Sequence, residues 1–193
     1  SEPPGRLRPA PANTRKAMTR LAGYPLLLII AAALVTPLAG AAAPEQAHAR
    51  CKYANTKTTK LTKKQARKAV RCVVNRERSA RNLKPRPALR RAAQKHTRYM
   101  RKHNCFSHQC PGEPPLETRV RSAGYLRGAR AYSLGEVVAY NRARATPRDI
   151  VRQLMGSPGH RQQLMDPGYR HLGVGVSARN GTSLYTIVLG SKR

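Results

Sequence analysis

The sequence has 193 residues, which is enough for one domain with a hydrophobic core. Its 38 lysine and arginine residues against 8 acidic residues give a formal charge of +30, and such a field attracts polyanions. A nucleic-acid partner is not expected, because tryptophan is absent, phenylalanine occurs once and no nucleic-acid-binding motif is present.

The first 49 residues have the pattern of a targeting segment. Residues 18–49 start at Met18 and contain an apolar run, preceded by basic residues and closed by small ones, which is typical of a secretory signal peptide. The alternative is a membrane anchor, but the apolar core is short for a span and Pro37 interrupts it. Residues 1–17 show no periodicity, and we expect a disordered N-terminal extension there.

Cleavage of such a signal would leave an exported, strongly basic protein. Removing residues 1–49 takes away five basic and two acidic residues, which leaves 33 bases, 6 acids and a formal charge of +27. We therefore expect a secreted or envelope-associated monomer, with anionic envelope polymers or lipids as partners. No single run of lysine and arginine is long or patterned enough to name a binding site.

All four cysteines follow the signal segment, and an even count in an oxidising compartment favours two disulfides. The favoured pairing is Cys51 with Cys72, which ties the start of the mature chain to a helix, and Cys105 with Cys110, which closes a tight loop. A structural zinc site is the alternative, but the spacings match no standard zinc motif.

Residues 50–71 are predicted to form a lead-in segment and the start of the first helix. Apolar spacing and capping signals predict five helices in chain order. They cover residues 62–80, 87–103, 116–123, 146–156 and 157–165. Alternating or β-branched segments predict strands over 132–140, 172–176 and 184–189, with a hairpin turn at Asn180-Gly181. This order predicts an α+β fold with helices packed on a small antiparallel sheet.

Four polar residues from four separate segments are candidates for one cleft: His108, Glu113, Glu136 and His160. Glu136 shares its strand face with apolar residues, where an ionised carboxylate is costly without a partner. Two imidazoles and two carboxylates suit a divalent cation such as zinc, or acid–base chemistry. His96 and His103, on or beside the apolar face of a predicted helix, are instead interpreted as core or boundary histidines.

Several short motifs occur in an order that resembles one known family. They are Asn75-Arg-Glu-Arg78, His96-Thr-Arg-Tyr-Met100, Phe106-Ser-His108, Gly135-Glu136, Ser157-Pro-Gly-His-Arg161, Gly173-Val-Gly-Val176 and Tyr185-Thr-Ile-Val-Leu-Gly190. Together they resemble the bacterial branch of the CAP superfamily, also called SCP domains, over residues 72–190.

The resemblance implies a three-layer α-β-α sandwich with a central cleft. The family's cleft tetrad of two histidines and two acids would be His108, Glu113, Glu136 and His160 here, with His108 and His160 as the metal ligands where a metal is bound. Some relatives bind zinc, others bind sterols or fatty acids, and no general enzymatic activity is established. This chain departs from the family at Val137 and Ile187, where the family has asparagine and glutamine.

Three functional hypotheses follow. The first is a non-enzymatic secreted domain that binds a divalent metal or a small apolar ligand in the His/Glu cleft and associates with the cell envelope. The second is a metal-dependent hydrolase that uses the same tetrad, although the two lost polar residues argue against it. The third is a structural, basic envelope-binding module whose tetrad is vestigial.

Overall fold

The computed structural model describes residues 51–142 and 145–193, so the predicted extension and signal peptide lie outside the described residues. The elements in chain order are η1 (Thr58–Lys60), α2 (Lys63–Glu77), β1 (Lys84–Pro85), α3 (Pro87–Lys102), α4 (Leu116–Ser122), β2 (Tyr132–Asn141), α5 (Pro147–Met155), α6 (Pro158–Met165), β3 (His171–Arg179) and β4 (Thr182–Lys192). Within these residues, no helix has the length and apolar character needed to cross a membrane.

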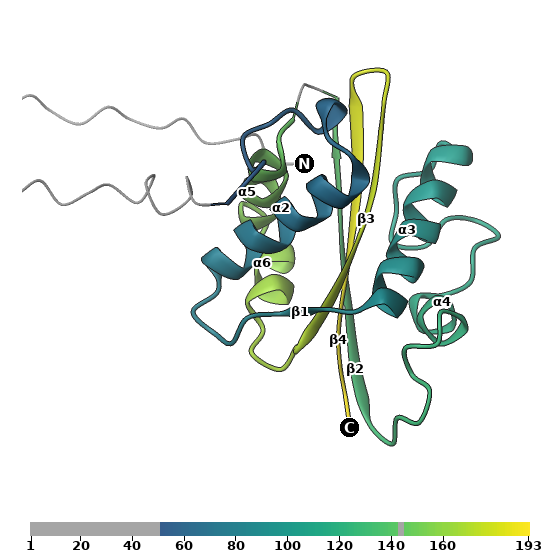
Figure 1. Ribbon diagram of the computed structural model, residues 1–193. Coiled ribbons are helices and arrows are strands. Elements are labelled where there is room, and N and C mark those ends of the chain that lie inside the picture. The colour runs from purple at the N-terminus through teal and green to yellow at the C-terminus, as the bar shows by residue number, and fades with distance from the viewer. Residues whose placement is uncertain (1–50, 143–144) are drawn as a thin grey trace, which may run out of the picture. The chain divides into compact units, whose positions relative to one another are not determined.

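The described part of the chain forms three layers, with a four-stranded sheet between two groups of helices (Figure 1). Helices α2, α5 and α6 cover one face of the sheet, and α3 and α4 cover the other. The strand order is β1-β3-β4-β2, and β4 pairs antiparallel with both β2 and β3. The predicted α+β sandwich is therefore confirmed.

One strand was not predicted, and it makes the sheet mixed instead of purely antiparallel. Strand β1 has only two residues, both with exposed side chains, and it runs parallel to β3. Its pairing uses backbone groups alone, with Lys84 N–H donating to Arg170 O at 2.9 Å and Arg86 N–H to Leu172 O at 2.9 Å. Such a strand leaves no side-chain periodicity in the sequence.

The first helix begins and packs as its sequence predicts. Thr62 caps α2, and its hydroxyl accepts from Gln65 N–H while the Gln65 side chain accepts from Thr62 N–H. The apolar stripe of α2 then packs on the sheet with α5, and its buried members are Ala66, Ala69, Val70, Val73 and Val74. The helix ends at Glu77, three residues earlier than predicted.

Alternation along β2, β3 and β4 sends side chains into two different layers. Val137, Val174 and Ile187 face the core under α2 and α5. Glu136 and Val188, which are register partners on neighbouring strands, belong to the opposite set of positions, toward α3 and α4. The second face thus combines an apolar patch with the one acidic residue of β2.

Two disulfides are present, and they join the pairs that the sequence favours. Cys51–Cys72 ties the segment before η1 to α2, with Cα atoms 5.7 Å apart. Cys105–Cys110 closes the loop that follows α3, with Cα atoms 6.0 Å apart. The second bridge shapes the short segment that carries His108.

The close packing of α3 on β3 depends on glycine at Gly175. A Cβ there would overlap the Ala93 carbonyl oxygen and the Thr97 hydroxyl oxygen, each less than 3.0 Å away. We predict that Gly175→Ala lowers the free energy of unfolding by more than about 3 kcal/mol, because helix backbone cannot move aside without opening the layer. Gly159→Ala in α6, where a Cβ meets nothing within 4 Å, should not lower it, because alanine is the better helix former. Urea denaturation of both oxidised variants measures the difference, and equal effects would contradict this account.

Candidate functional site

The centre of the candidate site is a buried ion pair between Arg119 of α4 and Glu136 of β2. Arg119 donates from Nη1 to Glu136 Oε2 at 3.0 Å and from Nη2 to Oε1 at 3.3 Å, so the two groups meet along two hydrogen bonds. Both residues are more than nine-tenths buried. The sequence places an acid on this inward-facing strand position, and Arg119 is the partner that such an acid requires.

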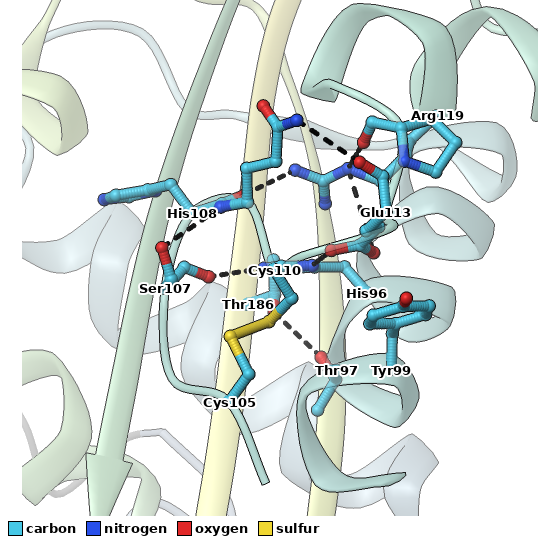
Figure 2. Close-up of polar contacts among 12 residues, drawn as sticks. His96, Thr97, Tyr99, Cys105, Ser107, His108, Cys110, Glu113, Arg119 and Thr186 are labelled. Carbon is cyan, nitrogen blue, oxygen red and sulfur yellow. Dashed lines mark hydrogen bonds and ion pairs between the residues drawn. A yellow bond between two sulfur atoms is a disulfide. The ribbon is translucent and has the colours of Figure 1, made fainter. Parts of the chain in front are cut away.

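Arg119 also holds the loop between α3 and α4 (Figure 2). Its Nη2 donates to the backbone carbonyl of His108 at 2.8 Å, and its Nε donates to the carbonyl of Pro114 at 3.1 Å. Its Nε also lies 4.0 Å from Glu113 Oε1. One guanidinium therefore connects the strand carboxylate to two points of the segment between α3 and α4, one inside the disulfide loop and one just before α4, which gives that segment a fixed position over the sheet.

A second buried pair joins His96 of α3 to Glu113. His96 Nδ1 lies 2.7 Å from Glu113 Oε2, and His96 Nε2 lies 3.1 Å from the carbonyl of Ser107. A carbonyl oxygen can only accept, so Nε2 carries a hydrogen. Neither group is free to contact a ligand, because His96 is fully buried and Glu113 nearly so.

His108 lies above the Arg119–Glu136 pair and reaches the surface. Its Nδ1 is 3.3 Å from Glu136 Oε1, and its side chain is 56% exposed. The ring of His160, at the start of α6, has its centroid 6.2 Å from that of His108. Burial, and then the nearby His108, lower the pKa of His160 below its ordinary value. Two imidazoles thus face each other at the surface over a buried carboxylate.

The electrostatics of Glu136 result from opposing effects. Burial alone would raise the pKa of its carboxyl, because it disfavours the charged form. The hydrogen bond from His108 and the positive charge of Arg119 outweigh that effect, and the net pKa of Glu136 lies below its ordinary value. Glu136 is therefore a firmly ionised carboxylate and a weak base.

Three of the four residues predicted from sequence, His108, Glu136 and His160, lie close together. Glu113 is linked to them through shared partners, because His96 lies 2.7 Å from Glu113 and 3.8 Å from Glu136, and Arg119 lies near both carboxylates. Within residues 51–142 and 145–193, no group of three or more histidine, cysteine or acidic side chains is placed to hold a metal ion. The residues present fit a metal only through two imidazoles.

Sequence reasoning missed Arg119 and the polar role of His96. His96 was correctly interpreted as a core residue, but its ring is part of the hydrogen-bonded cluster. The interpretation of His103 was wrong, since it is exposed at the end of α3 and stacks on Tyr99 with centroids 4.1 Å apart. Arg119 belongs to a seven-residue helix that is too short to show a periodic face. The one available signal was the unpartnered acid at position 136.

The fold and this site define a CAP-type domain, and the sequence comparison identifies the family. The family described as the cysteine-rich secretory protein family, CAP, matches residues 64–189, which is more than half of the chain. The chain therefore belongs to the CAP family.

Three bacterial proteins are similar to this chain in sequence or in fold. The uncharacterized protein YkwD of Bacillus subtilis (strain 168) is 30% identical over 106 residues, which cover 53% of this chain and 39% of YkwD. An extracellular protein containing an SCP domain from Bacillus anthracis str. Ames superposes with a TM-score of 0.53 at 23% identity, over 65% of this chain and 39% of that one. An outer surface protein of Borrelia burgdorferi gives a TM-score of 0.59 at 12% identity, over 69% of this chain and 97% of that one.

These comparisons show the fold and the family. The chain spans about two fifths of the length of YkwD and of the Bacillus anthracis protein. At identities below 25%, the two structural matches establish a shared fold alone.

Removing Arg119 should be far more costly than removing an exposed arginine. We predict that Arg119→Met lowers the free energy of unfolding by about 3–5 kcal/mol, because Glu136 is left as a buried charge without a partner. The double variant Arg119→Met/Glu136→Leu should recover at least half of that loss. Urea denaturation of the wild type, both single variants and the double variant measures the coupling, and additive losses would contradict a direct interaction.

The lowered pKa of Glu136 predicts a pH-dependent part of the stability. A carboxylate whose pKa is depressed by folding stabilises the native state above its unfolded value, near 4.5 here, and that contribution is lost as pH falls through the folded-state pKa. The stability difference between wild type and Glu136→Gln should thus shrink as the pH falls below about 5. Denaturation from pH 7 to pH 3 measures it. The other acids are common to both proteins and cancel, so a constant difference would exclude this linkage.

Proposed function

We propose that this chain is an exported, non-enzymatic CAP domain that binds a ligand at the surface formed by His108 and His160, and that it associates with the cell envelope. The observation that supports it most directly is that both buried carboxylates are already hydrogen-bonded to other side chains. Arg119 bonds both oxygens of Glu136, and His96 bonds Glu113. What stays exposed at the site is imidazole.

The commitment of the carboxylates argues against a hydrolase. A general base must reach the proton that it abstracts, and it works best with a pKa near the working pH. Glu136 is buried, and its pKa is lowered. Glu113 is also buried, and His96 occupies its carboxyl group. Neither carboxyl is therefore suited to activate a water molecule, and the cluster acts to position the loop.

The position of His108 supports a ligand-binding role. Glu136 fixes the imidazole through Nδ1, and within the described residues Nε2 makes no hydrogen bond. An imidazole that a carboxylate orients through one nitrogen presents the other to a metal ion in the common carboxylate–histidine–metal arrangement. A divalent cation such as zinc is thus the candidate ligand, held by His108 and His160 and otherwise by water. Two protein ligands predict modest affinity.

Export and envelope association rest on the chain's charge and on its relatives. Structural neighbours are described as an extracellular protein and an outer surface protein. The chain has the sequence pattern of a signal peptide, and its predicted mature part is strongly basic. A cationic protein outside the cell meets anionic polymers and lipids there, so its surface charge favours retention at the envelope.

Zinc titration calorimetry on the untagged, oxidised chain tests the ligand site. The wild type should bind about one Zn²⁺ ion, and His108→Ala/His160→Ala should bind it at least about tenfold more weakly. His103→Ala is the matched control, because it removes an exposed imidazole elsewhere and should change nothing.

Other outcomes would favour the alternatives. Equal zinc binding by the wild type and the double variant would remove metal from the proposal and favour the structural module. Chelator-sensitive hydrolysis that Glu136→Gln abolishes would show an enzyme and overturn the non-enzymatic assignment.

A further inference from the structure

A groove with cationic walls lies at the edge of the sheet that β1 and β3 form, and neither His108 nor His160 lines it. It has a volume of about 550 Å³ and runs between α2 and the first turn of α3, at the edge formed by β1 and β3. Its floor is apolar and consists of Pro85, Pro87, Leu172, Gly173 and Val174. Six cations line it: Lys64, Arg67, Lys68, Arg71, Arg86 and Arg90. No acidic residue is among its lining residues.

Four of the six cations form a continuous stripe on α2. Residues 64, 67, 68 and 71 follow the spacing i, i+3, i+4, i+7, which places them on one face of a helix. A second hollow of about 310 Å³ shares Lys68 and Arg71 with the groove and adds Arg76 farther along the helix. The positive surface therefore extends along most of α2, a helix about 22 Å long.

Two of these arginines are held in place by neutral partners. Arg67 donates from Nε to the carbonyl of Val174 at 3.1 Å and also bonds the Gln94 side chain. Arg86 lies 2.9 Å from the ring of His171. Within residues 51–142 and 145–193, none of the six groove cations forms an ion pair with a carboxylate.

This cluster of like charges is repulsive by itself. Burial, and then the charges of Arg90 and Arg98, lower the pKa of the Arg67 guanidinium. Like charges four residues apart on a helix destabilise it by a few tenths of a kcal/mol per pair. The first turn of α3 adds to the positive potential, because it has neither an acidic residue nor a side-chain cap. A bound anion would relieve all of these effects.

We propose that this groove binds a linear phosphate polymer that carries no nucleobases. The concave shape fits a chain, whereas a flat bilayer surface cannot follow a hollow between two helices. Nucleic acid is disfavoured, since no aromatic side chain lines the groove for bases to stack on. The lysine and arginine walls contact its phosphates.

The inference rests on the envelope association proposed above and names the surface and the partner responsible for it. Its test uses a purified polymer, so a failure would remove the groove assignment and leave export untouched. The probe is fluorescently labelled long-chain inorganic polyphosphate, titrated with the oxidised chain at several salt concentrations and followed by anisotropy.

The groove variant is Lys64→Gln/Lys68→Gln/Arg71→Gln/Arg90→Gln. We expect its affinity at 0.15 M salt to fall at least about tenfold, and the slope of log K against log salt to fall by about 3, because fewer counterions are released. The control variant Lys102→Gln/Arg127→Gln/Arg130→Gln/Arg179→Gln removes the same charge from exposed positions outside the groove and should lose less than about threefold.

A measurement on the unmodified chain removes any dependence on how the variants fold. Bound polyphosphate should protect Lys64 and Lys68 from acetylation, read by mass spectrometry, and should leave Lys102 reactive. Equal losses in the groove and control variants, or equal protection of all three lysines, would overturn the proposal in favour of a diffuse charge effect. Tighter binding of oligo(dT), or of phosphatidylglycerol vesicles with the same dependence on the groove cations, would also overturn it.

Discussion

The buried pair of Arg119 and Glu136 is the interaction on which the polar part of this fold depends. A carboxylate on the inner face of a strand needs a compensating charge, and Arg119 supplies it along two hydrogen bonds. The same guanidinium bonds the backbone of His108 and Pro114, so the disulfide loop takes its position from the ion pair. Arg119 thereby links α4 to the sheet, compensates the charge of Glu136 and fixes the loop.

The buried residues of the site and its exposed residues have different parts in the proposed function. The acids and Arg119 are buried and bonded to one another, and they fix the orientation of groups nearer the surface. His108 is the member that passes from this cluster to the exterior, with Glu136 on one ring nitrogen. The arrangement supports the proposed recognition of a ligand by a preset imidazole more than it supports proton transfer by the carboxylates.

A second group of charged residues lies at the other edge of the sheet, which β1 and β3 form. Asp149 and Glu117 serve as local partners, of Thr146 and Arg121, and no acid of the described residues lines the groove beside α2. Part of the excess of lysine and arginine lines a concave surface, because α2 and the start of α3 meet there at β1 and β3.

The sequence by itself determined the features that depend on neighbours along the chain. The capping box of Thr62 and Gln65, the apolar spacing of α2 and the inward face of Glu136 are all local patterns with a period of 3.6 or 2. The motif order also sufficed for the family. The tertiary structure alone decided the partners: Arg119 for Glu136, and His96 for Glu113, both 17 residues away. It alone decided β1 and the groove as well, because a backbone-only pairing and a surface assembled from separate elements leave no periodic trace in the sequence.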